Sequence, residues 1–84
     1  MYRKMIELRF YHRQGCHLCD EMWEQLSAMN GLEKILLVKV DIDRDAEIKA
    51  EYGLRIPCLE GPDGVSLSEH YLDQSRLLSY LRDV

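Results

Sequence analysis

Residues 6–19 read IELRFYHRQGCHLC, and the hydrophobic period changes within this segment. Over residues 5–12 apolar and polar side chains alternate, which is the period of a β-strand with one buried face. Gly15 interrupts this pattern. From residue 16 to about residue 29, apolar side chains recur every three or four positions, as on one face of an α-helix. The segment therefore predicts a strand, a short loop and a helix, with two cysteines where the helix begins.

A second strand and a second helix are predicted next. Residues 35–42, ILLVKVDI, are nearly continuous in apolar side chains, as in a strand that is covered on both faces of a parallel sheet. Asp43 can cap a short helix over residues 45–52, and Gly53 can end it. The order of these segments predicts two parallel strands joined by a right-handed crossover, with helices on both faces of the sheet.

The remaining residues predict a hairpin and a closing helix. Two short extended pieces within residues 56–68 flank a GPDG sequence at residues 61–64, which is typical of tight turns. Asp73 can cap the last helix. The leucines expected on the buried face of that helix are Leu77, Leu78 and Leu81. The whole order is βαβαββα, an α/β fold with a four-stranded mixed sheet flanked by helices.

Length, composition and charge limit the class of protein. We expect residues 1–84 to form a single domain. A net charge of −4 argues against nucleic acid as a partner, because nucleic-acid binding requires a basic surface. We expect neither a signal peptide nor a membrane span, since no apolar run approaches the ~20 residues needed to cross a bilayer. Three cysteines, two of them close together, differ from the even set of a disulfide-rich secreted protein and favour a cytoplasmic location.

Cys16 and Cys19, together called the dithiol, are the candidate catalytic residues. They follow a strand and lie in the first turn of a helix, where unpaired backbone amides and the helix dipole favour an anion. The thiolate is the reactive form of cysteine, and its ordinary pKa of ~8.5 can fall well below neutrality in such surroundings. A protonated His17 would add to this effect. We expect Cys16 to attack a substrate disulfide and Cys19 to resolve the mixed disulfide.

Other interpretations of the cysteines stay open. A zinc site generally takes four ligands, of which the dithiol supplies half. The residues that could complete such a set are Cys58, His12, His17 and His70. We expect no metal and no bound cofactor, but a redox-inactive binding module that holds a metal through the dithiol, or recruits a protein partner, is the alternative to an enzyme. Cys58 is a candidate third thiol, although a lone cysteine in a short apolar strand is more often buried and inert.

These residues resemble those of the thioredoxin superfamily, and most closely those of glutaredoxin-like proteins. The resemblance extends over about residues 5–81. The segments that carry it are residues 10–19, 40–43, 51–57 and 61–68, followed by the closing helix from Asp73. It implies a thioredoxin-like fold of the glutaredoxin type and a thiol-disulfide oxidoreductase activity.

The resemblance also implies roles for individual residues. Pro57 is expected to be a cis-proline beside the dithiol, and the backbone of Ile56 is expected to pair with the extended chain of a substrate. Arg13 and Asp73 occupy positions that contact glutathione in glutaredoxins. The implied partners are protein disulfides or glutathione mixed disulfides, with glutathione or a reductase as the electron donor. The protein is expected to act as a monomer.

The chain departs from the usual glutaredoxin pattern at three places. His17-Leu18 replaces the Pro-Tyr between the cysteines, and Arg55-Ile56-Pro57 replaces Thr-Val-Pro. Glu69-His70 replaces a Gly-Gly pair, where bare backbone lets glutathione approach. Side chains at that pair obstruct glutathione, and Glu69 repels a carboxylate. The resemblance therefore transfers the fold more directly than the use of glutathione.

Overall fold

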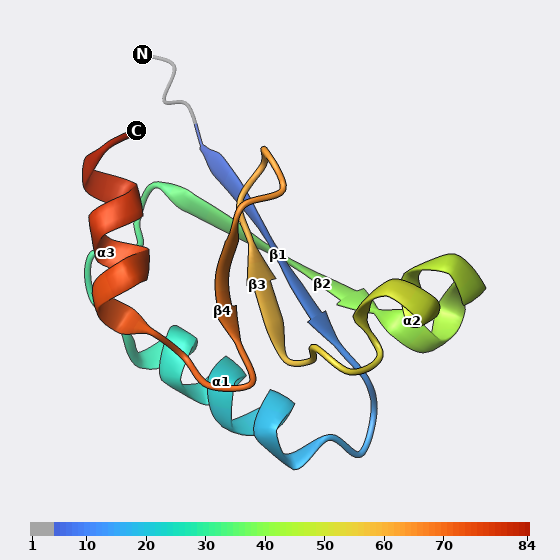
Figure 1. Ribbon diagram of the computed structural model, residues 1–84. Coiled ribbons are helices and arrows are strands. Elements are labelled where there is room, and N and C mark those ends of the chain that lie inside the picture. Colours follow the sequence, from blue (N-terminus) through green and yellow to red (C-terminus); the bar gives the residue numbers. More distant parts are fainter. Residues whose placement is uncertain (1–4) are drawn as a thin grey trace.

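The structure is a computed structural model that describes residues 5–84 (Figure 1). The elements, in chain order, are β1 (Ile6–His12), α1 (His17–Ala28), β2 (Ile35–Asp41), the 3-10 turn η1 (Ile42–Arg44), α2 (Ala46–Tyr52), β3 (Cys58–Glu60), β4 (Ser66–Glu69) and α3 (Gln74–Arg82). This order confirms the βαβαββα prediction. None of the helices described is long and apolar enough to cross a membrane.

The four strands form one mixed sheet with the order β2-β1-β3-β4. β1 and β2 are parallel, with Ile6 opposite Ile35 and His12 opposite Asp41. β3 is antiparallel to β1 on one side and to β4 on the other. The parallel pair and the hairpin expected from the sequence are therefore both present, and the pairing of β1 with β3 joins them. The α/β fold class with a mixed four-stranded sheet is confirmed.

α1 and α3 pack on the same face of the sheet (Figure 1). The alternation along β1 directs Leu8 and Phe10 to this face, where they meet the apolar side of α1. The buried residues of this main core are Leu8, Phe10, Cys19, Met22, Leu26, Ile35, Leu59, Leu67 and Leu77. Cys19 thus belongs to the core, whereas Cys16 packs only against its margin.

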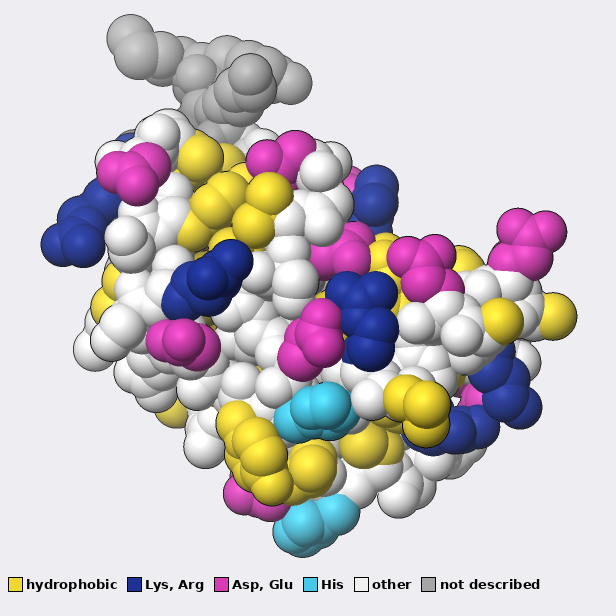
Figure 2. All heavy atoms as spheres, in the orientation of Figure 1, with side chains coloured by type: hydrophobic (Ala, Val, Ile, Leu, Met, Phe, Trp, Pro, Cys, Tyr) yellow, Lys and Arg dark blue, Asp and Glu magenta, His cyan; other side chains and the backbone are white. Residues whose placement is uncertain are grey.

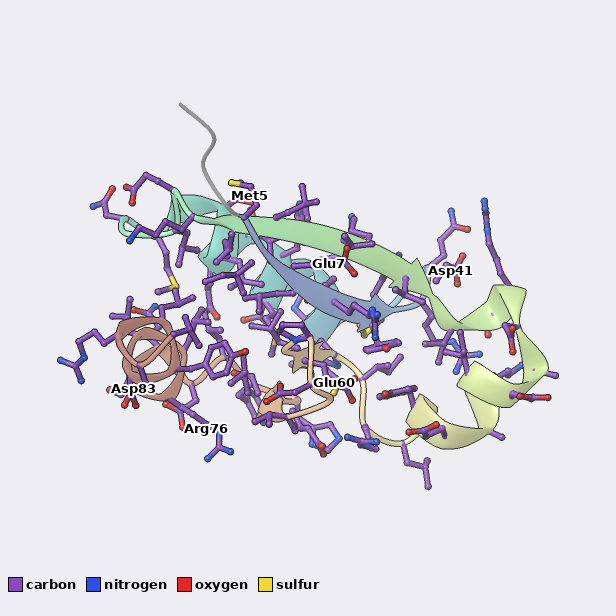
Figure 3. All side chains as sticks on the ribbon, turned by 90° about the horizontal axis from the view of Figure 1, so that it is seen from above. Met5, Glu7, Asp41, Glu60, Arg76 and Asp83 are labelled. Atoms are coloured by element: carbon purple, nitrogen blue, oxygen red, sulfur yellow. A yellow bond between two sulfur atoms is a disulfide. The ribbon has the colours of Figure 1, made fainter. Side chains whose placement is uncertain are left out.

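A second, smaller cluster lies on the other face of the sheet, beside α2. Its buried residues are Tyr11, Ile42, Tyr52 and Cys58. The rings of Tyr11 and Tyr52 stack, with their centroids 3.8 Å apart. Figures 1 and 3 show α2 past the carboxyl end of β2, beyond Asp41. This helix therefore covers the end of the sheet from which the dithiol loop also leaves.

The apolar run of β2 had predicted a strand that is buried on both faces, but β2 is not buried in this way. It is an edge strand, Leu36 is 51% exposed, and of its other residues only Ile35 is buried. The prediction was wrong because α2 is short and packs beside the end of the strand instead of along it (Figure 3). A continuous apolar run does not by itself distinguish an edge strand from a central one.

Two details of the helices also correct the sequence analysis. Asp45, not Asp43, caps α2, and its carboxylate accepts hydrogen bonds from two backbone N–H groups of the first turn. The helix begins later than expected because the chain first makes the turn η1. On α3, Leu77 is buried and Leu81 is partly buried, but Leu78 is 39% exposed. Leu78 follows Leu77 directly, so the helical rotation turns it away from the sheet.

Candidate functional site

The dithiol lies at the start of α1, immediately after the loop that leaves β1. Cys16 is the N-cap residue and Cys19 lies one turn later, with their Cα atoms 5.1 Å apart. Their sulfur atoms form a disulfide. Cys16 is partly exposed, whereas Cys19 is only 2% exposed and packs in the main core. A reacting molecule can therefore reach Cys16 far more easily than Cys19.

The start of α1 offers a backbone donor to Cys16. The N–H of Cys19 donates to the Sγ atom of Cys16, with an N···S distance of 3.1 Å. In the reduced protein the same donor and the helix dipole would stabilise a thiolate on Cys16. Asp20 adds a negative charge in the first turn, which acts against that thiolate. Of the two sulfur atoms, that of Cys16 is thus the one that accepts a backbone hydrogen bond at the helix start.

The Ile56–Pro57 peptide bond is cis and lies at the same end of the sheet as the dithiol loop. The register shows this, because Cys58 pairs with Tyr11, near the end of the strand that leads into the loop. Pro57 is buried. Ile56 is partly buried and packs against both the main core and the smaller cluster. The structure therefore brings together the two segments that the resemblance assigned to one site.

Arg13, which the resemblance implies for glutathione binding, is held in an ion pair. Its guanidinium donates to both carboxylate oxygens of Asp43, at 2.7 and 3.2 Å. Lys49 Nζ lies 3.6 Å from the same carboxylate. The hydrogen bond from Arg13, with the positive charges of both residues, holds the pKa of Asp43 below its ordinary value. This pair ties the dithiol loop to the turn η1.

His17, which was expected to tune the thiolate, lies on the outer surface of α1. Its side chain is 88% exposed, and its Nε2 atom lies 3.4 Å from a carboxylate oxygen of Glu21. An exposed imidazole beside a carboxylate acts on a neighbouring sulfur mainly through solvent, which screens charge. The tuning of Cys16 by His17 stays a prediction.

Glu69 and His70 hold the segment that precedes Pro57. Glu69 accepts a hydrogen bond from the Nε atom of Arg55 at 3.0 Å, and the Nη2 atom of Arg55 lies 2.9 Å from the same carboxylate oxygen. His70 has a φ of 69°, in the left-handed region that residues other than glycine seldom adopt. Its backbone N–H donates to the Pro57 carbonyl at 2.8 Å, and its ring Nε2 lies 2.9 Å from the Leu54 carbonyl oxygen. The end of β4 thus braces the loop beside the dithiol.

Asp73 caps α3, as the sequence itself indicates. Its carboxylate accepts a 3.0 Å hydrogen bond from the backbone N–H of Arg76. Its own N–H donates to the hydroxyl oxygen of Ser68 at 2.9 Å. These contacts account for an aspartate at this position through local structure alone. Its contact with glutathione stays a prediction.

Cys58 differs from Cys16 in its exposure and in the element that holds it. It is fully buried in β3, the strand that lies between β1 and β4. Burial raises the pKa of its thiol to about 11, although the positive charge of Arg55 acts in the opposite direction. At neutral pH the thiol is therefore protonated as well as inaccessible, and these features favour the inert interpretation of Cys58.

The sequence analysis missed a group of polar side chains around β3. Glu60 is only 5% exposed, and its carboxylate accepts a 2.6 Å hydrogen bond from the hydroxyl of Tyr52. Burial and this hydrogen bond raise the pKa of Tyr52. Arg55 lies over the Tyr52 ring, with 4.7 Å to its centroid, and its Nη2 atom lies 3.9 Å from Glu60. The available signal was Glu60 itself, because a charged residue in a short apolar strand requires a partner.

The residues considered as further zinc ligands do not gather around the dithiol. Within residues 5–84, no group of three or more His, Cys, Asp or Glu side chains is arranged to hold a metal ion. His12 stacks on Phe10, with 5.8 Å between the ring centroids, and His70 contacts the loop before Pro57.

The fold and the site define the protein as a thioredoxin-like domain with a Cys-x-x-Cys pair. A family model described as Glutaredoxin-like domain (DUF836) matches residues 7–82. The match covers nearly the whole chain, and the chain therefore belongs to the glutaredoxin-like domain family.

Solved structures agree with this assignment. Protein Ne2328 from Nitrosomonas europaea shares 27% sequence identity with a TM-score of 0.78, over 95% of both chains. The protein XcR50 from X. campestris shares 35% identity with a TM-score of 0.65, over 92% of this chain and 97% of its own. A mutant thioredoxin from Halobacterium salinarum NRC-1, at 19% identity, has a TM-score of 0.64 over 95% of this chain and 74% of its own, which shows the fold alone. No curated protein sequence matches the chain.

Proposed function

We propose that this protein is a thiol-disulfide oxidoreductase of the glutaredoxin-like type. The observation that carries the proposal is the asymmetry of the dithiol, in which a partly exposed Cys16 at a helix start is bonded to a buried Cys19. This asymmetry separates an attacking thiol from a resolving thiol. Membership of the glutaredoxin-like family supports the same chemistry.

The first step is the attack of the Cys16 thiolate on one sulfur of a substrate disulfide. A new bond forms between Cys16 and that sulfur, and the substrate's S–S bond breaks. The other substrate sulfur leaves as a thiolate and takes a proton from solvent. The backbone N–H of Cys19, which donates to Cys16, stabilises the negative charge on the attacking atom before the step.

The second step is resolution by Cys19. Once deprotonated, Cys19 attacks the sulfur of Cys16, the mixed disulfide breaks, and the substrate leaves as a second thiolate. The product is the Cys16–Cys19 disulfide, the state seen in the structure. In sum, the substrate disulfide gains two electrons and the dithiol loses two. Because Cys19 is buried beside Cys16, resolution needs no large movement of the chain.

The cycle closes when an external thiol reductant restores the dithiol. The two electrons would come either from two molecules of glutathione, one electron from each, or from the dithiol of a reductase. In both cases the incoming thiol attacks at the end of the sheet where Ile56 and Pro57 lie beside the dithiol loop. We propose that the backbone of Ile56 pairs there with the extended chain of a substrate.

A redox titration tests this function directly. The protein is equilibrated in glutathione buffers, its free thiols are trapped, and each adduct is located by mass spectrometry. We expect a Cys16–Cys19 disulfide with a midpoint between about −270 and −200 mV, the span of thioredoxins and glutaredoxins. The Cys19→Ser variant should accumulate a mixed disulfide on Cys16. If all three thiols stay reduced across this range, catalysis is excluded and the redox-inactive binding module becomes the better interpretation.

A further inference from the structure

Arg13 and Arg55, which flank the dithiol loop and Pro57 in the chain, are already paired with carboxylates. Arg13 donates two hydrogen bonds to Asp43, and Arg55 donates one hydrogen bond to Glu69 and forms an ion pair with it. Glutathione carries two carboxylates, which a protein recognises best with guanidinium groups that can form paired hydrogen bonds. To bind a carboxylate of glutathione, either arginine would have to break its contacts with the carboxylate that it already pairs with. At these two positions no unpaired guanidinium is therefore available to a carboxylate of glutathione.

Apolar side chains border the same end of the molecule. Leu54 is 93% exposed and Tyr71 is 72% exposed. His70 lies between these two residues, because its ring contacts the Leu54 carbonyl and Tyr71 is the next residue in the chain. Figure 2 shows two histidines with hydrophobic side chains gathered around them at the lower end of the molecule, where α1 begins beneath β4. Exposed apolar side chains beside a reactive group indicate a binding surface.

A small hollow of about 100 Å³ lies between α1 and residues 70–72. Leu18 and Met22 of α1 line one side, and Tyr71 and Leu72 line the other. The volume suits one side chain, because pockets that enclose whole ligands usually measure ~300–1,000 Å³. Leu18 lies directly before Cys19 in the chain, so the hollow lies on the helix that carries the dithiol, although neither cysteine lines it. We call the hollow together with exposed Leu54 the apolar rim.

The charge beside the apolar rim is negative. Glu21 lines the hollow, and Asp20 is exposed in the first turn of the same helix. The imidazole of His17 lies 3.4 Å from the Glu21 carboxylate and carries a positive charge only when protonated. A lysine or arginine on a bound chain would therefore meet a complementary surface.

We propose that the substrate is a polypeptide disulfide whose cysteine is flanked by an apolar residue and a basic residue, and not glutathione disulfide. The apolar side chain occupies the hollow beside Leu18, and the basic side chain lies against Asp20 and Glu21. Cys16 then attacks the substrate sulfur between them, by the steps given above. This inference rests on the proposed oxidoreductase function and adds the class of substrate to it.

Single-turnover kinetics test the substrate class. The reduced protein is mixed with four disulfides, and Cys16–Cys19 formation is followed by acid trapping and mass spectrometry. The disulfides are bis(2-hydroxyethyl) disulfide, oxidised glutathione, a short peptide disulfide with Leu before and Lys after the cysteine, and a matched peptide with Ser and Asp at those positions. We expect the Leu/Lys peptide to react about tenfold faster than both oxidised glutathione and the Ser/Asp peptide, from one apolar contact and one charge contact.

Variants of the apolar rim sharpen the test. In Tyr71→Ser and in Leu54→Ser, the rate for the Leu/Lys peptide relative to that for bis(2-hydroxyethyl) disulfide should fall about three- to tenfold. Leu36→Ser, which changes an exposed leucine on the edge strand β2, should leave this ratio unchanged. More than half of each of the three side chains is exposed, so the variants are expected to fold, and circular dichroism is the check.

The outcomes separate the two proposals. If oxidised glutathione reacts as fast as the Leu/Lys peptide, or if the rim variants leave the ratio unchanged, the substrate class is wrong while the oxidoreductase function stands. If none of the four disulfides oxidises the dithiol, both proposals fail. A faster Leu/Lys peptide whose advantage is lost in Tyr71→Ser supports both.

Discussion

Cys16 of the dithiol and Cys58 lie at the same end of one sheet, yet their surroundings are opposite. Cys16 begins a helix, is partly exposed and receives a backbone hydrogen bond on its sulfur. Cys58 lies in a strand with neighbours on both sides, is fully buried and has its thiol pKa raised to about 11 by burial. The comparison predicts that Cys16 is the reactive thiol and that Cys58 is inert, although both lie at the same end of the sheet.

Replacing each cysteine with serine should produce the largest difference between the two regions. Cys16→Ser should abolish disulfide reduction, because a hydroxyl does not form the mixed disulfide. Cys58→Ser should retain the reaction but lower the free energy of unfolding by about 1–3 kcal/mol, since it buries a hydroxyl in an apolar cluster. Single-turnover rates and urea unfolding measure the two effects.

Alkylation of the reduced protein provides a control for this comparison. Iodoacetamide at neutral pH should modify Cys16 and spare Cys58. The raised pKa of Cys58 favours the protonated thiol in the folded state, so its contribution to stability is present at neutral pH and is lost as the pH rises from 9.0 toward about 11. Rapid labelling of Cys58 in the folded protein at pH 7 would contradict the comparison.

Tyr52→Phe should loosen the region of Cys58 without affecting the dithiol. The change removes the hydroxyl that donates to the buried Glu60, and it leaves that carboxylate without this partner. We expect a loss of about 1–3 kcal/mol in the free energy of unfolding, and faster labelling of Cys58. Tyr71→Phe is the matched control, because Tyr71 is largely exposed, and its stability should not change. Equal unfolding midpoints for the two variants would show that the Tyr52–Glu60 hydrogen bond does not stabilise the fold.

Asp43→Asn should have the smallest effect, on the dithiol loop. It weakens the pair with Arg13, which is exposed, so we expect only a slight decrease in stability at pH 7. The pKa of Asp43 is lowered in the folded state, and its contribution is therefore present above the ordinary carboxyl pKa and is lost as the pH falls below it. Urea midpoints of Asp43→Asn and of the unchanged protein should converge at low pH. A difference that persists at pH 2 would assign the effect to something other than this charge.

Much of the fold could be predicted because hydrophobic period is a local property. The alternation of residues 5–12 and the helical spacing after Gly15 specified the first strand, the first helix and the position of the dithiol between them. The structure corrected inferences that depend on neighbours in space. The apolar run of β2 predicted cover on both faces, and Asp43 was expected to cap a helix, but it pairs instead with Arg13, a residue distant in the chain.

The sequence by itself determined the order of the elements and the position of the dithiol at the start of the first helix, because both depend on residues close together in the chain. Only the tertiary structure decided which thiol is accessible, that Arg13 and Arg55 are already paired, and that Glu60 is buried against Tyr52. These properties arise from contacts between distant segments that form when the sheet assembles. The identity of a charged residue does not specify whether its side chain contacts water, a substrate or a carboxylate from a distant segment.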